Sequence, residues 1–380
     1  MTTATSWPRV RLGEIGQSLI GLTYRPDNVK RSGTLVLRSS NVQDGRLAFD
    51  DNVYVDSPIP ERIRVQENDI LICVRNGSRR LIGKSVLLDR RVVRQTFGAF
   101  MAVFRSDANP FLQYFFQSGD FKRQIDEHLG ATINQITNGS LNSFAVALPS
   151  AAEQRVIVAK LQDIDRLVTT LERLIAKRQA IKQGMMQQLL TGKTRLPGFT
   201  EPWQPRRLGN MLGYEQPGRY LVQTSQQLDA GRVPVLTAGK TFILGYTNEA
   251  DGIYTAHPVV IFDDFTTASK YVDFDFKAKS SAMKILSARP GVDLRFIYEC
   301  MQLIDFPLGD HKRYWISEYS KQELDVPSHS EQRAISAIVT DADEEVDLLR
   351  RRLAKARATK TGMMQQLLTG RARLPAEAAS

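Results

Sequence analysis

Residues 149–197 read PSAAEQRVIVAKLQDIDRLVTTLERLIAKRQAIKQGMMQQLLTGKTRLP, and residues 327–375 read PSHSEQRAISAIVTDADEEVDLLRRRLAKARATKTGMMQQLLTGRARLP. The two stretches align without a gap at an offset of 178 (327 minus 149), with about 28 identities in roughly 49 positions. The nonamer GMMQQLLTG occurs verbatim at 184–192 and 362–370. The chain therefore carries an internal duplication.

Each copy has the pattern of one long helix. Ser150 with Glu153, and Ser328 with Glu331, fit the capping box that starts a helix, and Gly192 and Gly370 fit its end. Apolar residues follow at alternating steps of four and three, at Ile157, Leu161, Ile164, Val168, Leu171 and Ile175, and at Ile335, Val339, Ala342, Val346, Leu349 and Leu353. This 3.5-residue period is typical of a coiled coil. We predict two antiparallel helices of about 41 residues that pair within the chain.

The GMMQQLLTG stretches are repeated more faithfully than the apolar stripe. Gly184 and Gly362 interrupt the helical pattern, and glycine costs a helix about 1 kcal/mol relative to alanine. We interpret this identity as a surface for another subunit, with methionines as adaptable contacts. A recent duplication that has not yet diverged is the alternative. The predicted partner-binding residues are Met185, Met186, Gln187, Leu190, Met363, Met364, Gln365 and Leu368.

A globular segment precedes each helical copy. Trp7 is followed by Arg-Leu-Gly at 11–13 and Trp203 by Arg-Leu-Gly at 207–209, while the interiors of the two segments share little. Short β-rich runs separated by turn signals, and a helical pattern at 111–128 or 294–304, predict mixed α/β (α+β) folds. The expected organisation is a globular domain at 1–149, a central helical region at 150–197, a second globular domain at 198–326 and a C-terminal helical region at 327–380. The molecule should have an internal pseudo-two-fold repeat.

Composition favours an intracellular protein with a polyanionic partner. The 380-residue chain has a formal net charge of +10, from 51 Lys+Arg against 41 Asp+Glu, which places nucleic acid first among possible partners. Two distant cysteines exclude a disulfide framework and suit a reducing cytoplasm. The N-terminus lacks the apolar core of a secretory signal, and no apolar run approaches the roughly 20 residues that cross a bilayer. We expect a cytoplasmic protein.

The candidate DNA contacts are polar, basic clusters in both variable segments. Arg, Asn and Gln read base edges with paired hydrogen bonds, whereas Ser, Thr and Lys suit phosphates. A solvated surface loop is the alternative for any single residue. The candidates are Arg75, Asn76, Ser78, Arg79, Arg80, Lys84, Thr132, Asn134, Gln135 and Asn138 in the first segment, and Thr237, Lys240, Thr266, Thr267, Ser269, Lys270, His311, Lys312, Arg313 and Tyr314 in the second.

We find no catalytic constellation in the sequence. The strings Gly192-Lys193-Thr194 and Gly239-Lys240-Thr241 lack the glycine that a phosphate-binding P-loop has five residues earlier. Four scattered histidines and two cysteines offer no zinc spacing, so no metal is expected. Asn109-Pro110-Phe111 is similar to the Asn-Pro-Pro-aromatic motif of amino-methyltransferases but lacks the second proline. We therefore expect a non-catalytic protein that directs enzymes supplied by others.

The pattern resembles the specificity subunits of type I restriction–modification systems. The resemblance covers essentially the whole chain and rests on the twin helices beginning PSxxEQR, the GMMQQLLTG endings and the Trp…Arg-Leu-Gly starts. ENDILICVRNG at 67–77 is similar to the family's strand and loop, with Asn68 where glycine is usual, and GATINQI and HKRYWISEYS are similar to endings of its target domains. The unequal lengths of the two segments leave the correspondence of their loops open.

The resemblance implies a division of labour. Each target domain would read one half of a bipartite double-stranded DNA site, and the paired helices would set the spacer and dock two methyltransferase subunits. S-adenosylmethionine would be bound by those partners and no cofactor by this chain, and a restriction/translocase subunit would join the full complex in phage defence. Two other hypotheses stay open: a coiled-coil adaptor without sequence-specific DNA binding, and the recognition half of a different modification or defence enzyme.

Overall fold

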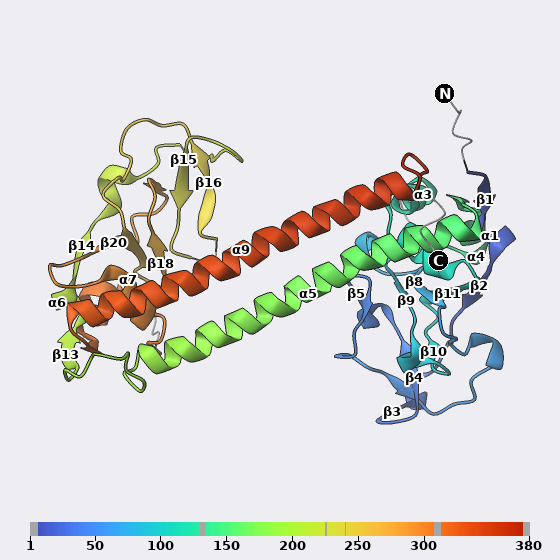
Figure 1. Cartoon of the computed structure of the whole chain (residues 1–380), viewed down its shortest axis with the longest axis horizontal. Coiled ribbons are helices and arrows are strands. Elements are labelled where there is room, and N and C mark those ends of the chain that lie inside the picture. The colour runs from blue at the N-terminus through green and yellow to red at the C-terminus, as the bar shows by residue number, and fades with distance from the viewer. Residues whose placement is uncertain (1–6, 130–133, 225, 240, 308–312, 375–380) are drawn as a thin grey trace. The chain divides into compact units, whose positions relative to one another are not determined.

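The computed structural model describes residues 7–129, 134–224, 226–239, 241–307 and 313–374. It divides into two compact units: unit 1 consists of residues 1–172 and 352–380, and unit 2 of residues 173–351. The division cuts through both long helices, α5 (Ala151–Leu189) and α9 (His329–Leu367). Each unit therefore contains one globular segment and one end of each helix (Figure 1).

Helices α5 and α9 are 39 residues each and run antiparallel within each unit. In unit 1, Lys360 pairs with Asp165 at 2.6 Å and Arg357 with Glu172 at 2.8 Å, so the residue number falls on α9 as it rises on α5. In unit 2, Arg178 pairs with Glu345 at 2.9 Å, and Lys182 pairs with Asp343. The prediction of two paired antiparallel helices is confirmed.

The apolar stripe predicted from the sequence forms the buried side of both helices. Leu161 and Val339 are fully buried, and Ile157, Val346 and Leu349 are nearly so. This burial stabilises the helices, because long helices in water owe most of their stability to tertiary packing. Within each unit, the globular segment packs against the helix ends of that same unit through its own core.

In unit 1 the globular segment contains two four-stranded sheets. One has the order β2-β11-β8-β9 and the other β10-β4-β7-β3, and β1 pairs with β12 at the base of the long helix. The strands are β1 (Arg9–Arg11), β2 (Gln17–Ile20), β3 (Val29–Lys30), β4 (Thr34–Leu37), β7 (Tyr54–Val55), β8 (Ile70–Cys73), β9 (Ser85–Leu87), β10 (Thr96–Phe97), β11 (Met101–Arg105) and β12 (Ala145–Ala147).

Unit 2 repeats this plan although the two segments share little sequence. Its four-stranded sheet has the order β14-β20-β17-β18, a three-stranded sheet has the order β16-β15-β19, and β13 pairs with β21 at the start of α9. The strands are β13 (Gln204–Arg207), β14 (Leu212–Glu215), β15 (Val233–Leu236), β16 (Ile243–Thr247), β17 (Val259–Asp263), β18 (Ser269–Val272), β19 (Lys277–Ala278), β20 (Met283–Ala288) and β21 (Glu323–Val326).

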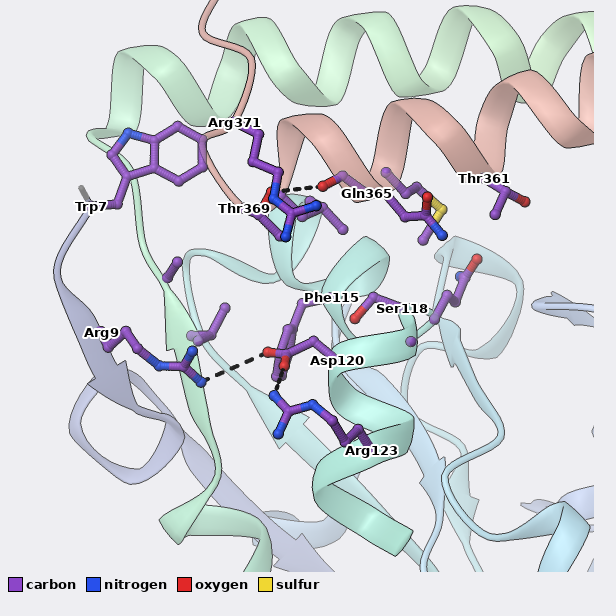
Figure 2. Close-up of a pocket in the computed structure, with 16 residues that line it drawn as sticks. Trp7, Arg9, Phe115, Ser118, Asp120, Arg123, Thr361, Gln365, Thr369 and Arg371 are labelled. Atoms are coloured by element: carbon purple, nitrogen blue, oxygen red, sulfur yellow. Dashed lines mark hydrogen bonds and ion pairs between the residues drawn. The ribbon is translucent and has the colours of Figure 1, made fainter. Parts of the chain in front are cut away.

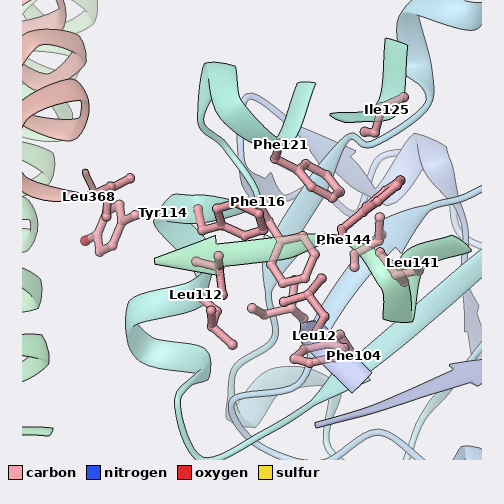
Figure 3. Close-up of a cluster of buried hydrophobic side chains, with 14 of the residues drawn as sticks. Leu12, Phe104, Leu112, Tyr114, Phe116, Phe121, Ile125, Leu141, Phe144 and Leu368 are labelled. Carbon is pink, nitrogen blue, oxygen red and sulfur yellow. The ribbon is translucent and has the colours of Figure 1, made fainter. Parts of the chain in front are cut away.

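The core of unit 1 joins the sheet to both long helices. Phe104, Phe116, Phe121 and Phe144 form an aromatic centre, and Leu368, directly after α9, belongs to the same cluster (Figure 3). The single helix predicted at 111–128 is wrong in one respect. The chain forms α2 (Asn109–Phe115) and α3 (Gly119–His128) instead. The hydroxyl of Ser118 accepts a hydrogen bond from the backbone N–H of Phe121 at 3.3 Å, and this cap starts a new helix.

In unit 2 the loop after α5 packs against Trp203, the tryptophan of the Trp…Arg-Leu-Gly motif. Gly192 has φ +68°, a backbone conformation that favours glycine, and a Cβ there would lie 3.4 Å from the ring of Trp203. The Arg195 guanidinium stacks over the same ring at 5.7 Å and makes two hydrogen bonds of 2.7 Å to the carboxylate of Glu331. We name Gly192, Arg195, Trp203 and Glu331 the tryptophan clasp of unit 2.

Unit 1 holds an equivalent clasp built from the two ends of the described chain. Gly370 has φ +72° and faces Trp7 at 3.4 Å, Arg373 lies over the Trp7 ring at 5.6 Å, and Trp7 Nε1 donates to Glu153 at 3.3 Å. Packing against the two tryptophans therefore explains the glycine and the arginine that the ends of the two repeats share.

The clasps also account for one failed prediction. Ser150 and Glu153 form the expected capping box, with Ser150 N–H donating to Glu153 at 3.1 Å and Glu153 N–H to Ser150 at 3.3 Å. The predicted box of Ser328 and Glu331 is wrong, because Arg195 engages the Glu331 carboxylate and the Ser328 hydroxyl pairs with Ser330 instead.

Among the described residues, no helix is long and apolar enough to cross a membrane.

Candidate nucleic-acid interface

Two of the predicted contact clusters of unit 1 come together in space. The loop that follows β8 meets the segment that precedes α4 (Asn138–Ser143). Arg75 and Gln135 form an isolated antiparallel bridge, the Asn76 N–H donates to the Asn134 carbonyl at 3.4 Å, and Asn134 Nδ2 donates to the Gly77 carbonyl at 3.2 Å. Side chains that can read bases are thus presented from one joined surface rather than from two separate loops.

The equivalent two loops also meet in unit 2, and a buried aspartate joins them. Asp264 follows β17, its carbonyl accepts the Tyr314 N–H at 2.9 Å, and its carboxylate accepts the Trp315 N–H at 2.8 Å. Lys284 on β20 lies 3.0 Å from the other carboxylate oxygen and also donates to Gln216 at 3.1 Å. The Asp264 and Lys284 side chains are 2% and 1% exposed, so this ion pair is part of the interior.

A second acidic anchor holds another loop of unit 2. The Glu249 carboxylate accepts the backbone N–H groups of Gln223 and Thr224 at 3.0 Å and 3.2 Å and lies 2.8 Å from the ammonium group of Lys277. The hydrogen bond from Lys277, followed by those from the two backbone groups, lowers the pKa of Glu249 to about 2. A carboxylate held in this way fixes the course of the segment between β14 and β15.

Comparison with known proteins identifies the architecture. Residues 5–183 match the family model for the type I restriction modification DNA specificity domain. The structure resembles that of the type I restriction–modification S subunit from M. genitalium, with a TM-score of 0.62 at 14% identity and coverage of 97% of this chain and 98% of the other. The chain therefore carries a type I restriction modification DNA specificity domain at residues 5–183. This match includes the globular segment of unit 1.

Two sequence relatives carry the same family name. The specificity subunit of the Escherichia coli type I restriction enzyme EcoR124I/EcoR124II is 52% identical over 138 residues, which are 35% of this chain and 34% of that protein. The match thus spans about a third of the E. coli relative's length. The putative MjaX specificity subunit of Methanocaldococcus jannaschii is 24% identical over 399 residues, covering 93% of this chain and 90% of that protein.

The structure places most of the predicted DNA contacts at the surface. Arg75, Ser78, Arg79, Arg80, Gln135, Thr266 and Arg313 are exposed, and Asn76, Lys84, Asn134, Thr237, Thr267 and Lys270 are half-buried. Arg79 is tied to α3, since it donates to the carbonyls of Asp126 at 3.2 Å and Leu129 at 3.4 Å. Thr132, Lys240, His311 and Lys312 lie outside the described residues.

Two predicted contacts lie in the interior instead, and the half-buried Asn138 is held by a hydrogen bond within the chain. Ser269 is 7% exposed and its hydroxyl accepts a hydrogen bond from Gln302 at 2.9 Å. Tyr314 is 2% exposed and packs against Phe306, because its hydrophobic ring turns inward at the start of a short helix. Asn138 donates to the Ser18 carbonyl at 3.0 Å and begins α4. The side chains of Ser269 and Tyr314 are corrections to the sequence-based set.

Some of the predicted partner-binding residues are buried, and others are exposed or half-buried. Leu190, Met364 and Leu368 are buried in the cores of their units, so packing explains them and they are not surface contacts. Gln187 and Gln365 are exposed, and Met185, Met186 and Met363 are half-buried. In unit 1, a groove of about 750 Å³ runs beside this stretch, with Gln365, Thr369 and Arg371 on one wall and Arg9, Asp120 and Arg123 on the other (Figure 2).

Sequence reasoning missed two residues of the candidate interface. Phe100 precedes β11 and is 57% exposed beneath the Arg75 guanidinium, which lies 5.1 Å from its ring. Ser39 receives hydrogen bonds from Asn76 at 3.5 Å and Lys84 at 3.4 Å. In the sequence, Phe100 stands at the start of an apolar β-run at 100–104, so nothing in the sequence marks its side chain as exposed.

The described parts of the chain offer no group of three or more residues that could hold a metal ion. The cysteines are buried and free, and burial raises the pKa of the Cys73 thiol to about 11 and that of Cys300 further still. Such thiols are protonated at neutral pH and are poor nucleophiles. The chemistry on the surface of the two units is that of hydrogen-bond donors and cations.

Proposed function

We propose that this chain is the DNA sequence-specificity subunit of a type I restriction–modification complex, and that each unit reads one half of a bipartite double-stranded DNA site. The observation that carries this proposal is the convergence of the same two loops in both units, at Arg75 and Gln135 in one and at Asp264 and Tyr314 in the other. Two dissimilar sequences on one plan suit two different half-sites. The net charge of +10 supports a polyanionic partner.

The loops supply the chemistry that base reading requires. Arg75, Asn76 and Gln135 can each make paired hydrogen bonds to a base edge, and Arg313 is the corresponding exposed cation of unit 2. Neighbouring Lys84 and Thr266 suit phosphate oxygens, which position the protein without reading sequence.

The test is to exchange one loop and map the methylated sites. Replacing residues 266–270 with the corresponding loop of a specificity subunit that recognises a different sequence should alter one half-site and leave the other unchanged, as read by single-molecule sequencing of methylated adenines. A matched exchange of residues 76–80 should alter only the opposite half-site. Equal weakening at all sequences would mean that these loops touch phosphates alone. Absence of sequence-selective binding at any salt concentration would favour a coiled-coil adaptor instead.

We also infer that the GMMQQLLTG surfaces dock two methyltransferase subunits. Gly184 and Gly362 lie inside helices, where glycine is unfavourable, and a Cβ at either position would meet nothing within 4 Å. Packing within this chain therefore gives no reason for glycine. A partner backbone that approaches each helix closely supplies one, and Gln187 and Gln365 beside them are exposed donors and acceptors.

The docking proposal predicts that replacing both glycines raises the stability of the chain and weakens its binding to the methyltransferase. The double variant Gly184→Ala, Gly362→Ala should unfold at a higher urea concentration, because each alanine favours the helix by up to about 1 kcal/mol. The same variant should lose affinity for the methyltransferase at least tenfold in a pull-down or calorimetric titration. Thr170→Ala, at an exposed position elsewhere on α5, is the control and should gain stability without losing the partner. Full retention of binding by the glycine variant would contradict the docking proposal.

Other elements of the complex follow from the same proposal. The methyltransferase subunits would bind S-adenosylmethionine, a restriction/translocase subunit would complete the assembly, and this chain would perform no chemistry. The free, buried thiols suit the reducing cytoplasm in which such a complex would work. If the paired helices set the spacer, inserting one heptad into both α5 and α9 should lengthen the tolerated gap between half-sites without changing either half-site.

A further inference from the structure

A pocket of about 460 Å³ opens in unit 1 at the edge of the candidate interface. It is lined by residues 22–24, 38–40 and 98–101 together with Asp51. Backbone hydrogen bonds join the three segments: Leu22 N–H donates to Phe97 at 2.6 Å, Ala99 N–H to Leu22 at 2.9 Å and Gly98 N–H to Leu37 at 3.0 Å. The walls are therefore held by the fold and do not depend on a ligand.

The pocket lies among the predicted DNA contacts. Its residue Ser39 accepts hydrogen bonds from Asn76 and Lys84, and its residue Phe100 carries the Arg75 guanidinium over its ring. All three of these donors belong to the cluster at 75–84. A DNA strand bound by that cluster would pass over the mouth of the pocket.

The lining combines an aromatic face with polar groups. Phe100 is 57% exposed, although burying such a side chain would contribute about 1.5–3 kcal/mol, and Tyr24 lies half-buried in the same lining. Arg38 pairs with Asp51 at 2.8 Å, while its Nε and the Ser40 hydroxyl are buried without a hydrogen-bond partner in the described structure. Each such unsatisfied group costs about 1–3 kcal/mol. A planar ligand with an apolar face and a polar edge suits this lining.

We propose that this pocket receives a nucleobase that has left the stack of the bound DNA, with Phe100 as its stacking face and Arg38, Ser40 and Asp51 as the wall that hydrogen-bonds its edge. The proposal rests on the DNA-reading function proposed above. Extruding a base breaks its stacking and pairing in the duplex, and stacking on an aromatic side chain offsets only part of that cost. Hydrogen bonds to the base edge must supply the rest, so the pocket would favour some bases over others and would contribute to specificity.

The test is a scan of the half-site read by unit 1 with 2-aminopurine, whose fluorescence rises when it leaves the stack. The complex of the full chain with its methyltransferase is bound to duplexes labelled at each position in turn. We expect a severalfold rise at one position or more that is lost with Phe100→Ala and kept with Tyr214→Ala, an exposed aromatic residue of unit 2 outside the proposed contacts. A rise kept in both variants belongs to the methyltransferase. If no labelled position shows a fluorescence rise that is lost with Phe100→Ala, the pocket does not hold a base.

A second measurement does not depend on fluorescence, which stacking of 2-aminopurine on Phe100 would quench. Removing the base at the identified position should weaken binding by the wild type severalfold and leave Phe100→Ala unaffected, and equal effects on both proteins would overturn the proposal. Saturable binding of free deoxynucleotides in the absence of DNA would also overturn it and assign the pocket to a soluble nucleotide. Sequence-selective binding that persists while these tests fail leaves the DNA-reading function intact, whereas its loss in the wild type would refute that function itself.

Discussion

The buried pair of Asp264 and Lys284 gives the sharpest test of how unit 2 holds its recognition loops. Replacing Lys284 with methionine keeps the length of the side chain and removes the ammonium group 3.0 Å from the carboxylate. The Asp264 carboxylate, 2% exposed, would then lie in the interior without its cationic partner. Breaking a buried pair from one side costs about 3–5 kcal/mol. The Trp315 N–H still bonds the carboxylate, so we expect a loss near the lower end, about 3 kcal/mol.

The two buried cysteines allow the loss to be assigned to one unit. Cys73 lies in β8 of unit 1 and Cys300 in α7 (Leu294–Met301) of unit 2, and both react with thiol reagents only when their surroundings open. Peptide mass spectrometry after labelling in increasing urea reads the two units separately. With a slope of about 1–3 kcal/mol per molar urea, the midpoint for Cys300 should fall by at least about 1 M in Lys284→Met, while that for Cys73 stays unchanged.

Two further variants decide the cause. Lys321→Met removes an exposed lysine of unit 2 and should change stability by less than about 0.5 kcal/mol. Adding Asp264→Asn to Lys284→Met removes the unpaired charge while keeping an acceptor for Trp315, and should recover part of the loss. An unchanged Cys300 midpoint in Lys284→Met, or an equal fall for both cysteines, would refute the reasoning.

Three other predictions follow from single contacts. The pKa of Glu249 in the folded protein is about 2, below its ordinary value of 4.5. The ionised carboxylate therefore stabilises the fold above pH 4.5, and this stabilisation is lost as the pH falls toward 2. The difference in unfolding free energy between wild type and Glu249→Gln, measured in urea, should narrow over that range. Gly370→Ala should lower the stability of unit 1 by about 1–2 kcal/mol in the Cys73 labelling assay, since φ is +72° there, and an unchanged midpoint would argue against the clasp. Arg313→Ala should relax one half-site in methylation mapping, whereas Tyr314→Phe should leave the recognised sequence unchanged.

The sequence predicted the helical part of the fold well, because its signals are local. The heptad stripe, the Ser150 cap and the left-handed glycines at 192 and 370 each follow from spacing and residue type. The strands around Ile70 and Val259 were also predicted, since short apolar runs between turns are strong signals. What could not be predicted was the pairing of strands, which depends on contacts between residues far apart in the chain.

The candidate interface was predicted in its loops but less well in its side chains. A polar or aromatic residue in a loop gives no sign of which way it faces, and only the fold shows that Ser269 and Tyr314 point inward. Likewise, the sequence does not distinguish Asp264 from other acidic loop residues, because its ion-pair partner Lys284 is distant in sequence. The pocket beside Phe100 was invisible because three separate segments form it.

The structure also separates two causes of the repeated nonamer. Packing accounts for its leucines, which are buried at both copies, and the clasps account for Gly192 and Gly370. Packing does not account for the glycines at the start of the nonamer or for the exposed glutamines. A recent duplication would leave exposed positions alike along the whole helix, yet Leu167 in one copy corresponds to Glu345 in the other, and Ile181 to Thr359. Identity is unbroken through the nonamer, whereas exposed identities elsewhere on the helices, such as Arg155 with Arg333, are scattered. This is the pattern expected when one kind of partner binds both copies.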